Sequence, residues 1–177
     1  MNKMAKNSQL REYQNNILAR LENAKKAGAA APAGYLGVVI GQMNVLVNLQ
    51  EISETLPITH IKKVPLVKSW FLGLVNVRGV LYAINDISQL LENSFTGLSS
   101  NSRMLLISDA VSKNVAFMVD KLIGLRRLDE MTLREETSLD TLCFKPQTYR
   151  DAEDKVWYLL DCNQLVRSKV FATPYIS

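Results

Sequence analysis

The 177-residue chain is long enough for one ordinary domain or for two very small ones. Hydrophobic residues make up 47% of the sequence and charged residues 21%, which is typical of a globular, soluble protein, and no run of about 18 apolar residues predicts a transmembrane helix. The formal net charge of +4 is only mildly basic, and acidic residues are interspersed with basic ones, so the sequence lacks the clustered basic stripe of a typical nucleic-acid-binding protein.

The N-terminal segment contains lysine and glutamine but no apolar core, which argues against a secretion signal. Between residues 8 and 26, apolar side chains recur every three or four positions among polar ones, and this spacing predicts an amphipathic helix. Residues 27–34 are Ala, Gly and Pro and indicate a linker, so residues 1–34 form a separate N-terminal segment. The helix either packs back on its own domain or binds a partner.

From Tyr35 onward, short apolar runs separated by turns predict β-strands. Residues 50–56 either continue a strand or form a short helical turn, and Pro57 and Pro65 keep the connection that follows extended. Outside the central stretch, strands are predicted at 36–40, 44–49, 103–108, 114–119, 122–128 and 156–160, loops at 93–102 and 146–154, a helical or irregular segment at 129–144, a last helix from Asp161 and coil at 171–177.

The central stretch runs from Ser69 to Leu91 and contains two apolar runs of strand length, 72–77 and 80–84. Because glycine accepts a positive φ, the Arg78-Gly79 dipeptide between them predicts a tight hairpin turn with an exposed guanidinium at its tip. Asp86, followed by Gln89, predicts the start of a short helix whose first N–H groups are capped by the carboxylate. An ordinary hairpin with an arginine of no special role explains the pattern equally well.

Two parts of the sequence repeat. Residues 82–91 and 157–166 are both predicted to be aromatic-led strands that end in Asp-x-x-Gln-Leu, and residues 45–49 match 117–121 more weakly in the same order. The repeat predicts two copies of one small β unit, at approximately 35–100 and 101–167. A unit of that size buries only about 60% of its surface, so we expect the two halves to share a core.

The sequence offers little support for an enzyme. The single histidine, His60, lies in a Lys-rich connection without a nearby Cys or carboxylate pair, so no metal site is predicted. No nucleophile elbow or phosphate loop is present, no cofactor is expected, and Asp86 and Asp161 are better explained as helix caps. Cys143 and Cys162 are expected to be free buried thiols in a reducing cytoplasm. A small β-barrel that binds nucleic acid is the alternative function, although the aromatic residues lie in apolar runs that indicate a core.

The central stretch resembles the signature of the CheW-like coupling proteins of bacterial chemosensory arrays, a Gly-x-x-Asn-x-Arg-Gly turn followed by a strand and an Asp. The residues at the matching positions are Gly73, Asn76, Arg78, Gly79 and Asp86. The resemblance extends over residues 35–167 and includes a Glu at position 54 and an apolar strand that ends in Val119-Asp120.

The sequence departs from the family pattern at three places: Asn48 stands where an Asp is common, Ala83 where a Pro is common, and Pro146-Gln147 in a segment that usually holds a Gly. Within the family, the N-terminal helix and linker, the lead-in at 68–70 and the Phe-containing tail are most similar to the coupling proteins of type IV pilus twitching systems.

The resemblance implies a mainly β fold of two five-stranded SH3-like or OB-like barrels that share a core, with a short helix after the last strand of each barrel and a tail at 168–177. It implies no catalysis and no cofactor. Members of the family link the cytoplasmic tip of a methyl-accepting chemoreceptor to a CheA-like histidine kinase, so we expect both partners here, a cytoplasmic location at receptor arrays, no nucleic acid and no direct membrane insertion.

In the family, the receptor helix docks in the groove between the barrels, and the regulatory domain of the kinase docks edge to edge on the second barrel. Carried over by position, the residues of the receptor groove are Ile52, Glu54, Gly73 and Arg78. Turn and cap roles fall on Asn76, Gly79, Asp86 and Asp161.

Overall fold

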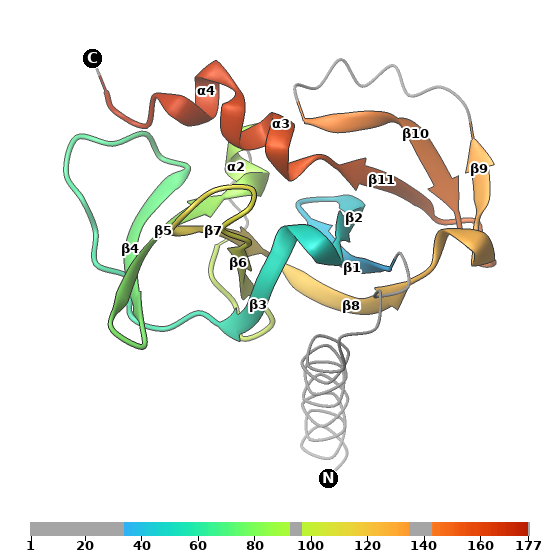
Figure 1. The fold of residues 1–177 in the computed structure, drawn as a ribbon, viewed down its shortest axis with the longest axis horizontal. Coiled ribbons are helices and arrows are strands. Elements are labelled where there is room, and N and C mark those ends of the chain that lie inside the picture. The colour runs from blue at the N-terminus through green and yellow to red at the C-terminus, as the bar shows by residue number, and fades with distance from the viewer. Residues whose placement is uncertain (1–33, 93–96, 135–142, 177) are drawn as a thin grey trace, which may run out of the picture.

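The computed structural model describes residues 34–92, 97–134 and 143–176, and the helix predicted at 8–26 lies outside these residues. The described part is mainly β (Figure 1). Its strands are β1 (Tyr35–Ile40), β2 (Met43–Asn48), β3 (Ile52–Pro57), β4 (Phe71–Val77), β5 (Val80–Asp86), β6 (Arg103–Ile107), β7 (Val115–Val119), β8 (Lys121–Arg126), β9 (Thr132–Arg134), β10 (Phe144–Arg150) and β11 (Val156–Leu160). Its helical elements are α2 (Ile87–Glu92), α3 (Cys162–Arg167), α4 (Lys169–Ala172) and the 3-10 turns η1 (Leu49–Glu51) and η2 (Leu128–Glu130).

The strands form two mixed sheets, which lie side by side in Figure 1. The first sheet has the order β8-β1-β2-β11-β10-β9, and the second has the order β3-β6-β7-β5-β4. Each sheet contains one parallel pair, β2 with β11 and β5 with β7, among antiparallel neighbours. Residues 50–56 satisfy both predicted alternatives, because η1 precedes β3.

The sheet orders give the internal repeat a structural meaning. The order β8-β1-β2-β11-β10 in the first sheet corresponds strand by strand to β3-β6-β7-β5-β4 in the second. Of these five corresponding strands, each sheet takes two from one half of the repeat and three from the other, so the halves are interleaved, and β9 is an additional strand in the first sheet. In both sheets the strand that ends in the repeated Asp, β5 or β11, belongs to the parallel pair and leads into a helix.

The register corrects the weaker sequence match by two residues. Val45 lies opposite Tyr158 in the first sheet, and Val115 lies opposite Ala83 in the second. Because Tyr158 and Ala83 correspond in the stronger repeat, the equivalent of Val45 is Val115 rather than Phe117. A shift of two residues keeps every side chain on the same face of the strand, so the apolar pattern alone could not detect it.

The largest hydrophobic core joins the two sheets. It combines buried side chains of β1 and β2 with side chains of β3, β6 and β7, and it includes residues of the helices after β5 and β11, namely Ile87, Cys162 and Leu165. Each sheet has one smaller hydrophobic cluster on its other face. The two halves therefore share a core, as their small size predicts.

The predicted loop at 146–154 is wrong in its first part, because residues 144–150 form β10. Pro146 lies inside this strand, where it cannot donate a backbone hydrogen bond. The pairing of β10 with β11 is irregular between Phe144 and Thr148, and within the described residues β10 pairs with β9 from Thr148 to Arg150. Proline is tolerated in a strand at such an irregularity, because no ladder bond is lost there.

The predicted coil at 171–177 is also wrong in part. Residues 169–172 form α4, and the Phe171 ring stacks on Trp70 at 5.6 Å between centroids and meets Phe117 edge-on at 5.9 Å. Beyond α4 the backbone is tied to the connection between β3 and β4, since Lys68 donates a hydrogen bond to the Pro174 carbonyl at 2.7 Å. We call residues 169–176 the strap and residues 58–70 the connection. The strap follows a strand of the first sheet and packs on the second.

We predict that Phe171→Ala lowers the free energy of unfolding by about 2–4 kcal/mol, because it removes an aromatic side chain packed between two rings. Tyr175→Ala on the same strap is the matched control, and we expect it to change stability by less than about 0.5 kcal/mol, because that ring is exposed. Urea unfolding followed by tryptophan fluorescence measures both. Equal stabilities for the two variants would show that Phe171 does not anchor the strap.

Candidate functional site

The hairpin between β4 and β5 closes with the predicted two-residue turn. Val77 pairs with Val80, and the turn residues Arg78 and Gly79 both have positive φ, at 51° and 89°. This is the geometry of a type I′ turn, whose twist matches that of the strands. The Asn76 side chain accepts a hydrogen bond from the Gly79 N–H at 2.9 Å, so the Asn and Gly of the signature shape the turn that carries Arg78.

Arg78 forms a bidentate ion pair with Glu54. Its Nη1 and Nη2 donate to Oε2 and Oε1 of Glu54 at 2.8 and 2.7 Å. Glu54 lies on β3, at one edge of the second sheet, whereas the hairpin includes β4, at the other edge. The pairing of β3 with β6 shifts register between Ile52 and Glu54, and such irregularities re-aim side chains. The pair therefore joins the hairpin tip to the opposite edge strand, with the Arg78 side chain 72% exposed.

The other two predicted groove residues are buried. Ile52 is 4% exposed and belongs to the shared core. Gly73 has a φ of 138°, and a Cβ at this position would lie 2.3 Å from the Lys62 carbonyl oxygen. Lys62 and Leu74 exchange backbone hydrogen bonds at 2.8 and 2.9 Å. Gly73 therefore lets the connection run against β4. Ile52 and Gly73 are themselves buried, so they support the strands that carry Glu54 and Arg78 but are not exposed to a partner.

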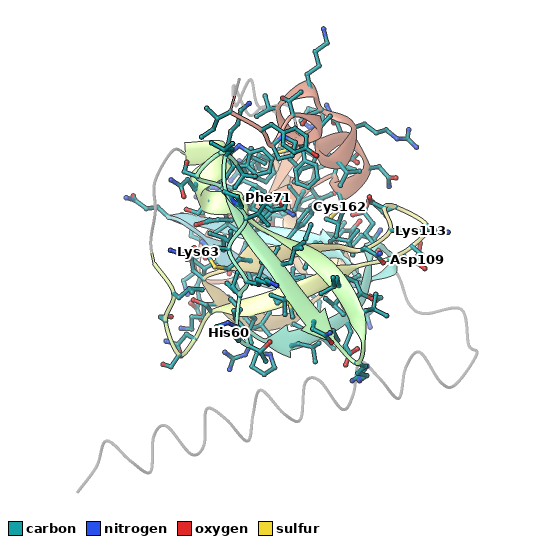
Figure 2. All side chains as sticks on the ribbon, turned by 90° about the vertical axis from the view of Figure 1, so that its left-hand side faces the viewer. His60, Lys63, Phe71, Asp109, Lys113 and Cys162 are labelled. Atoms are coloured by element: carbon teal, nitrogen blue, oxygen red, sulfur yellow. The ribbon has the colours of Figure 1, made fainter. Side chains whose placement is uncertain are left out.

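The sequence did not indicate that apolar residues beside Arg78 are exposed. Val80 and Leu81, the first residues of β5, are 43% and 53% exposed, whereas Ile84 in the same strand is fully buried. All three belong to one continuous apolar run, so the sequence contains no signal that separates the exposed end from the buried end. We call Arg78, Val80 and Leu81, together with Glu54, the hairpin tip surface (the hairpin faces the viewer in Figure 2).

The two repeated aspartates cap their helices in different surroundings. Asp86 and Asp161 accept hydrogen bonds through Oδ1 from the backbone N–H of Gln89 and Gln164, at 3.0 and 2.9 Å. Asp86 is fully buried, and its Oδ2 has no hydrogen-bond partner among the described residues. Burial raises the pKa of Asp86, and the negative charge of Asp120 adds to this, while the hydrogen bond from Gln89 lowers it.

The described residues show no alternative chemical centre. They contain no cluster of metal-binding side chains, and none of their helices is long and apolar enough to cross a membrane. Cys143 and Cys162 are buried free thiols, and burial raises the pKa of Cys143 to about 12, so it stays protonated and is a poor nucleophile. The two tryptophans are buried, so neither offers a stacking platform for a nucleobase.

We predict a coupling free energy of about 0.5–1 kcal/mol between Arg78 and Glu54 in a double-mutant cycle, because a bidentate pair at an exposed site is screened by water. Urea unfolding of Arg78→Ala, Glu54→Ala and the double variant measures it. A coupling energy several times larger would mean that the pair is a structural strut that holds the second sheet together.

We also predict that Asp86→Asn is at least as stable as the wild type at neutral pH, because Asn keeps the cap and removes a buried charge. The raised pKa means that the native state keeps the Asp86 proton to higher pH than the unfolded state, so the ionised form costs stability above that pKa. The advantage of Asp86→Asn should therefore vanish as the pH falls below the ordinary value of 3.8. Asp86→Ala and Asp161→Ala lose the cap and should each lose about 0.5–2 kcal/mol.

Thermal and urea unfolding between acid and neutral pH test the two effects together. A stability difference between Asp86→Asn and the wild type that does not change with pH would contradict the account of the buried charge. Wild-type stability in both alanine variants would contradict the account of the caps.

Comparisons with known proteins agree with this architecture. The CheW-like domain family matches residues 34–170, which is most of the chain. Among solved structures, the scaffolding protein TtCheW from Thermoanaerobacter tengcongensis superimposes with a TM-score of 0.64 at 15% sequence identity, over 78% of this chain and 95% of that one. A comparison with curated proteins found no match. The family match covers both sheets and the Arg78 hairpin, and the chain belongs to the CheW-like domain family.

Proposed function

We propose that this protein is a non-catalytic coupling protein that links the cytoplasmic tip of a methyl-accepting chemoreceptor to a CheA-like histidine kinase. The observation that carries the proposal is the hairpin tip surface. It presents two exposed apolar side chains, Val80 and Leu81, beside a guanidinium that is held in place by Glu54. Val80 and Leu81 are consecutive strand residues and point to opposite faces of the hairpin. A receptor helix that packs its apolar stripe on the Leu81 face buries that side chain and meets the charge at the rim.

The fixed position of Arg78 is what makes it suitable for recognition. Its backbone is set by a two-residue turn, and both of its terminal nitrogens are oriented by one carboxylate. A side chain held in this way loses little further conformational freedom when a partner binds, which favours affinity. The buried Ile52 and Gly73 act on the surface indirectly, through the core beneath β3 and the close contact between β4 and the connection.

The kinase is proposed to bind elsewhere, at a sheet edge. The regulatory domain of the kinase has the same fold in the family, so edge strands of the two proteins can align. The edge strands of the first sheet, β8 and β9, both come from the second half of the repeat, 101–167, and β9 is exposed along its length. A location in the cytoplasm, at receptor arrays, follows from these two partners.

Within the family, we propose that the chain acts as the PilI protein of a type IV pilus twitching-motility system. The support is the sequence similarity of the N-terminal helix, the linker, the 68–70 lead-in and the Phe-containing tail. The structure adds that the lead-in and the tail contact each other, through Trp70 and Phe171. Deletion of the gene should abolish twitching and leave flagellar swimming intact, and the reverse result would assign the protein to a flagellar pathway.

We predict that Leu81→Glu and Arg78→Ala each weaken binding to a purified cytoplasmic-tip fragment of a chemoreceptor from the same genome by at least tenfold, which corresponds to about 1.4 kcal/mol. The charge in Leu81→Glu lies where the apolar stripe of the receptor helix must pack. Leu133→Glu is the matched control, because Leu133 is exposed to a similar degree, 50% against 53%, but lies on β9 in the other sheet. Calorimetric titration measures all three affinities.

Equal affinities for Leu81→Glu, Leu133→Glu and the wild type would refute the assignment of the receptor site to the hairpin tip surface. Salt-sensitive binding of single-stranded nucleic acid, with no binding of receptor or kinase, would replace the whole proposal by the alternative function.

A further inference from the structure

Leu66, in the connection, occupies a position that is unfavourable for leucine in two respects. Its backbone has a φ of 58°, in the left-handed region that Gly and Asn enter most readily. Its side chain is also 78% exposed to solvent. The Pro65-Leu66 pair forms a turn, and a positive φ directly after a proline is typical of such turns, although Gly or Asn is the usual residue there. The turn does not account for the exposure of a leucine side chain, which is a reason to ask what that side chain contacts.

The strap brings two more exposed apolar side chains to Leu66. The Ile176 N–H donates to the Leu66 carbonyl at 3.1 Å, and Tyr175 pairs with Val67 in an antiparallel bridge. Tyr175 is 71% exposed and Ile176 is 61% exposed. In Figure 1 the connection loops outward and meets the C-terminal strap at one end of the second sheet. The backbone hydrogen bonds hold the two segments that carry these three exposed apolar side chains next to each other.

The connection and the whole C-terminal part of the chain from α3 onward concentrate positive charge. Residues 58–70 and 162–176 contain five Lys and Arg residues and no acidic residue. The whole chain has 21 basic and 17 acidic residues, and the segment before residue 34 holds six of the basic and two of the acidic ones, so the rest of the chain has 15 of each and is neutral. One third of its basic residues therefore lie in these segments. They are Lys62, Lys63, Lys68, Arg167 and Lys169, and none forms an ion pair with a described acidic side chain.

We propose that this surface, the strap face, binds an acidic amphipathic helix of a partner protein. The strap face consists of residues 60–68 of the connection and 167–176 at the end of the chain. The apolar stripe of the partner helix would cover Leu66, Tyr175 and Ile176, and its carboxylates would meet the surrounding lysines. The apolar part of this site is separate from the hairpin tip surface, because the strap packs at the beginning of β4 and Arg78 follows its end, about 20 Å away along a seven-residue strand. Lys62 pairs with Leu74 in the middle of β4, so the basic part of the site extends from there toward the strap.

The described features favour a protein helix over other negatively charged partners. The helical element of the strap face, α4, has four residues, which is too short for the amphipathic helices that lie in a bilayer surface. Nucleic acid would stack on aromatic side chains, but Tyr175 is the sole exposed aromatic side chain of the described strap face, and it lies beside two aliphatic ones. The N-terminal segment of this chain is itself basic, with six Lys and Arg against two Glu, so charge repulsion disfavours it as the occupant.

Binding of two synthetic helices to the full-length protein tests the proposal. One has a leucine stripe flanked by glutamates, and the other is identical except that lysines replace the glutamates. We expect the acidic helix to bind and the basic one not to bind, and we expect binding to weaken as salt is raised. Lys62→Glu/Lys63→Glu should weaken it at least tenfold. Lys113→Glu/Lys145→Glu is the matched control, and Figure 2 places Lys113 on the opposite side of the β4–β5 hairpin from Lys63.

Leu66→Asn separates recognition from folding. Asparagine accepts positive φ, so the variant should unfold at the same or a higher urea concentration than the wild type, and it should bind the acidic helix several-fold more weakly. Equal binding of both helices, an equal loss in the Lys113/Lys145 control, or unchanged binding by Leu66→Asn would overturn the proposal. So would failure to bind the acidic helix together with binding of anionic vesicles or single-stranded DNA. The Leu81→Glu variant should bind the acidic helix normally, so this test and the receptor test fail independently.

Discussion

The two parallel strand pairings hold this fold together. Each sheet is assembled from two separate pieces of chain, β1-β2 with β8-β9-β10-β11 in the first and β3-β4-β5 with β6-β7 in the second. In each sheet the pieces meet at one antiparallel pair, β1 with β8 or β3 with β6, and at one parallel pair, β2 with β11 or β5 with β7. Parallel neighbours need a long crossover, and the chain between β2 and β11 contains the whole of the second sheet. The first sheet is therefore completed only after the chain has passed through the second, and the largest core is common to both.

The same pairings explain the repeated aspartates. β5 and β11 end at the shared core, and the chain must leave each of them through a helix that lies against that core. Asp86 and Asp161 provide the acceptor for the first free N–H groups of those helices. The environments differ because α3 continues into α4 and the strap, whereas Asp86 is enclosed by its surroundings and carries an unsatisfied oxygen. The two aspartates therefore make the same capping hydrogen bond, but only Asp86 does so as a fully buried carboxylate with an unsatisfied oxygen.

The second sheet presents its two candidate interaction surfaces at opposite ends of one hairpin. At the tip, Arg78 is oriented by Glu54 from the far edge of the sheet. At the base, the strap and the connection are fixed by Trp70, Phe171 and their backbone hydrogen bonds. β4 connects the two ends, and Gly73 in its middle lets the connection run against it. Because both ends belong to one strand pair, partners bound at the two proposed surfaces would be held at a defined distance.

The sequence by itself determined the local features whose physics is local. These are most of the strands, the Arg78-Gly79 turn, the helix starts at the two aspartates, and a core shared by two small repeats.

Only the tertiary structure decided how the repeats interleave, because strand partners are chosen by contacts between residues far apart, and a two-residue shift leaves the apolar pattern unchanged. It also decided that Pro146 lies in a strand, where a neighbouring irregularity removes the need for its N–H, and that Phe171 anchors a strap, where Trp70 and Phe117 provide the packing. At the candidate site, the family resemblance pointed to Glu54 and Arg78, but the exposure of Leu81 and the burial of Ile52 depend on which neighbours cover each strand. Those neighbours are supplied by the other half of the chain, so no pattern within a strand can reveal them.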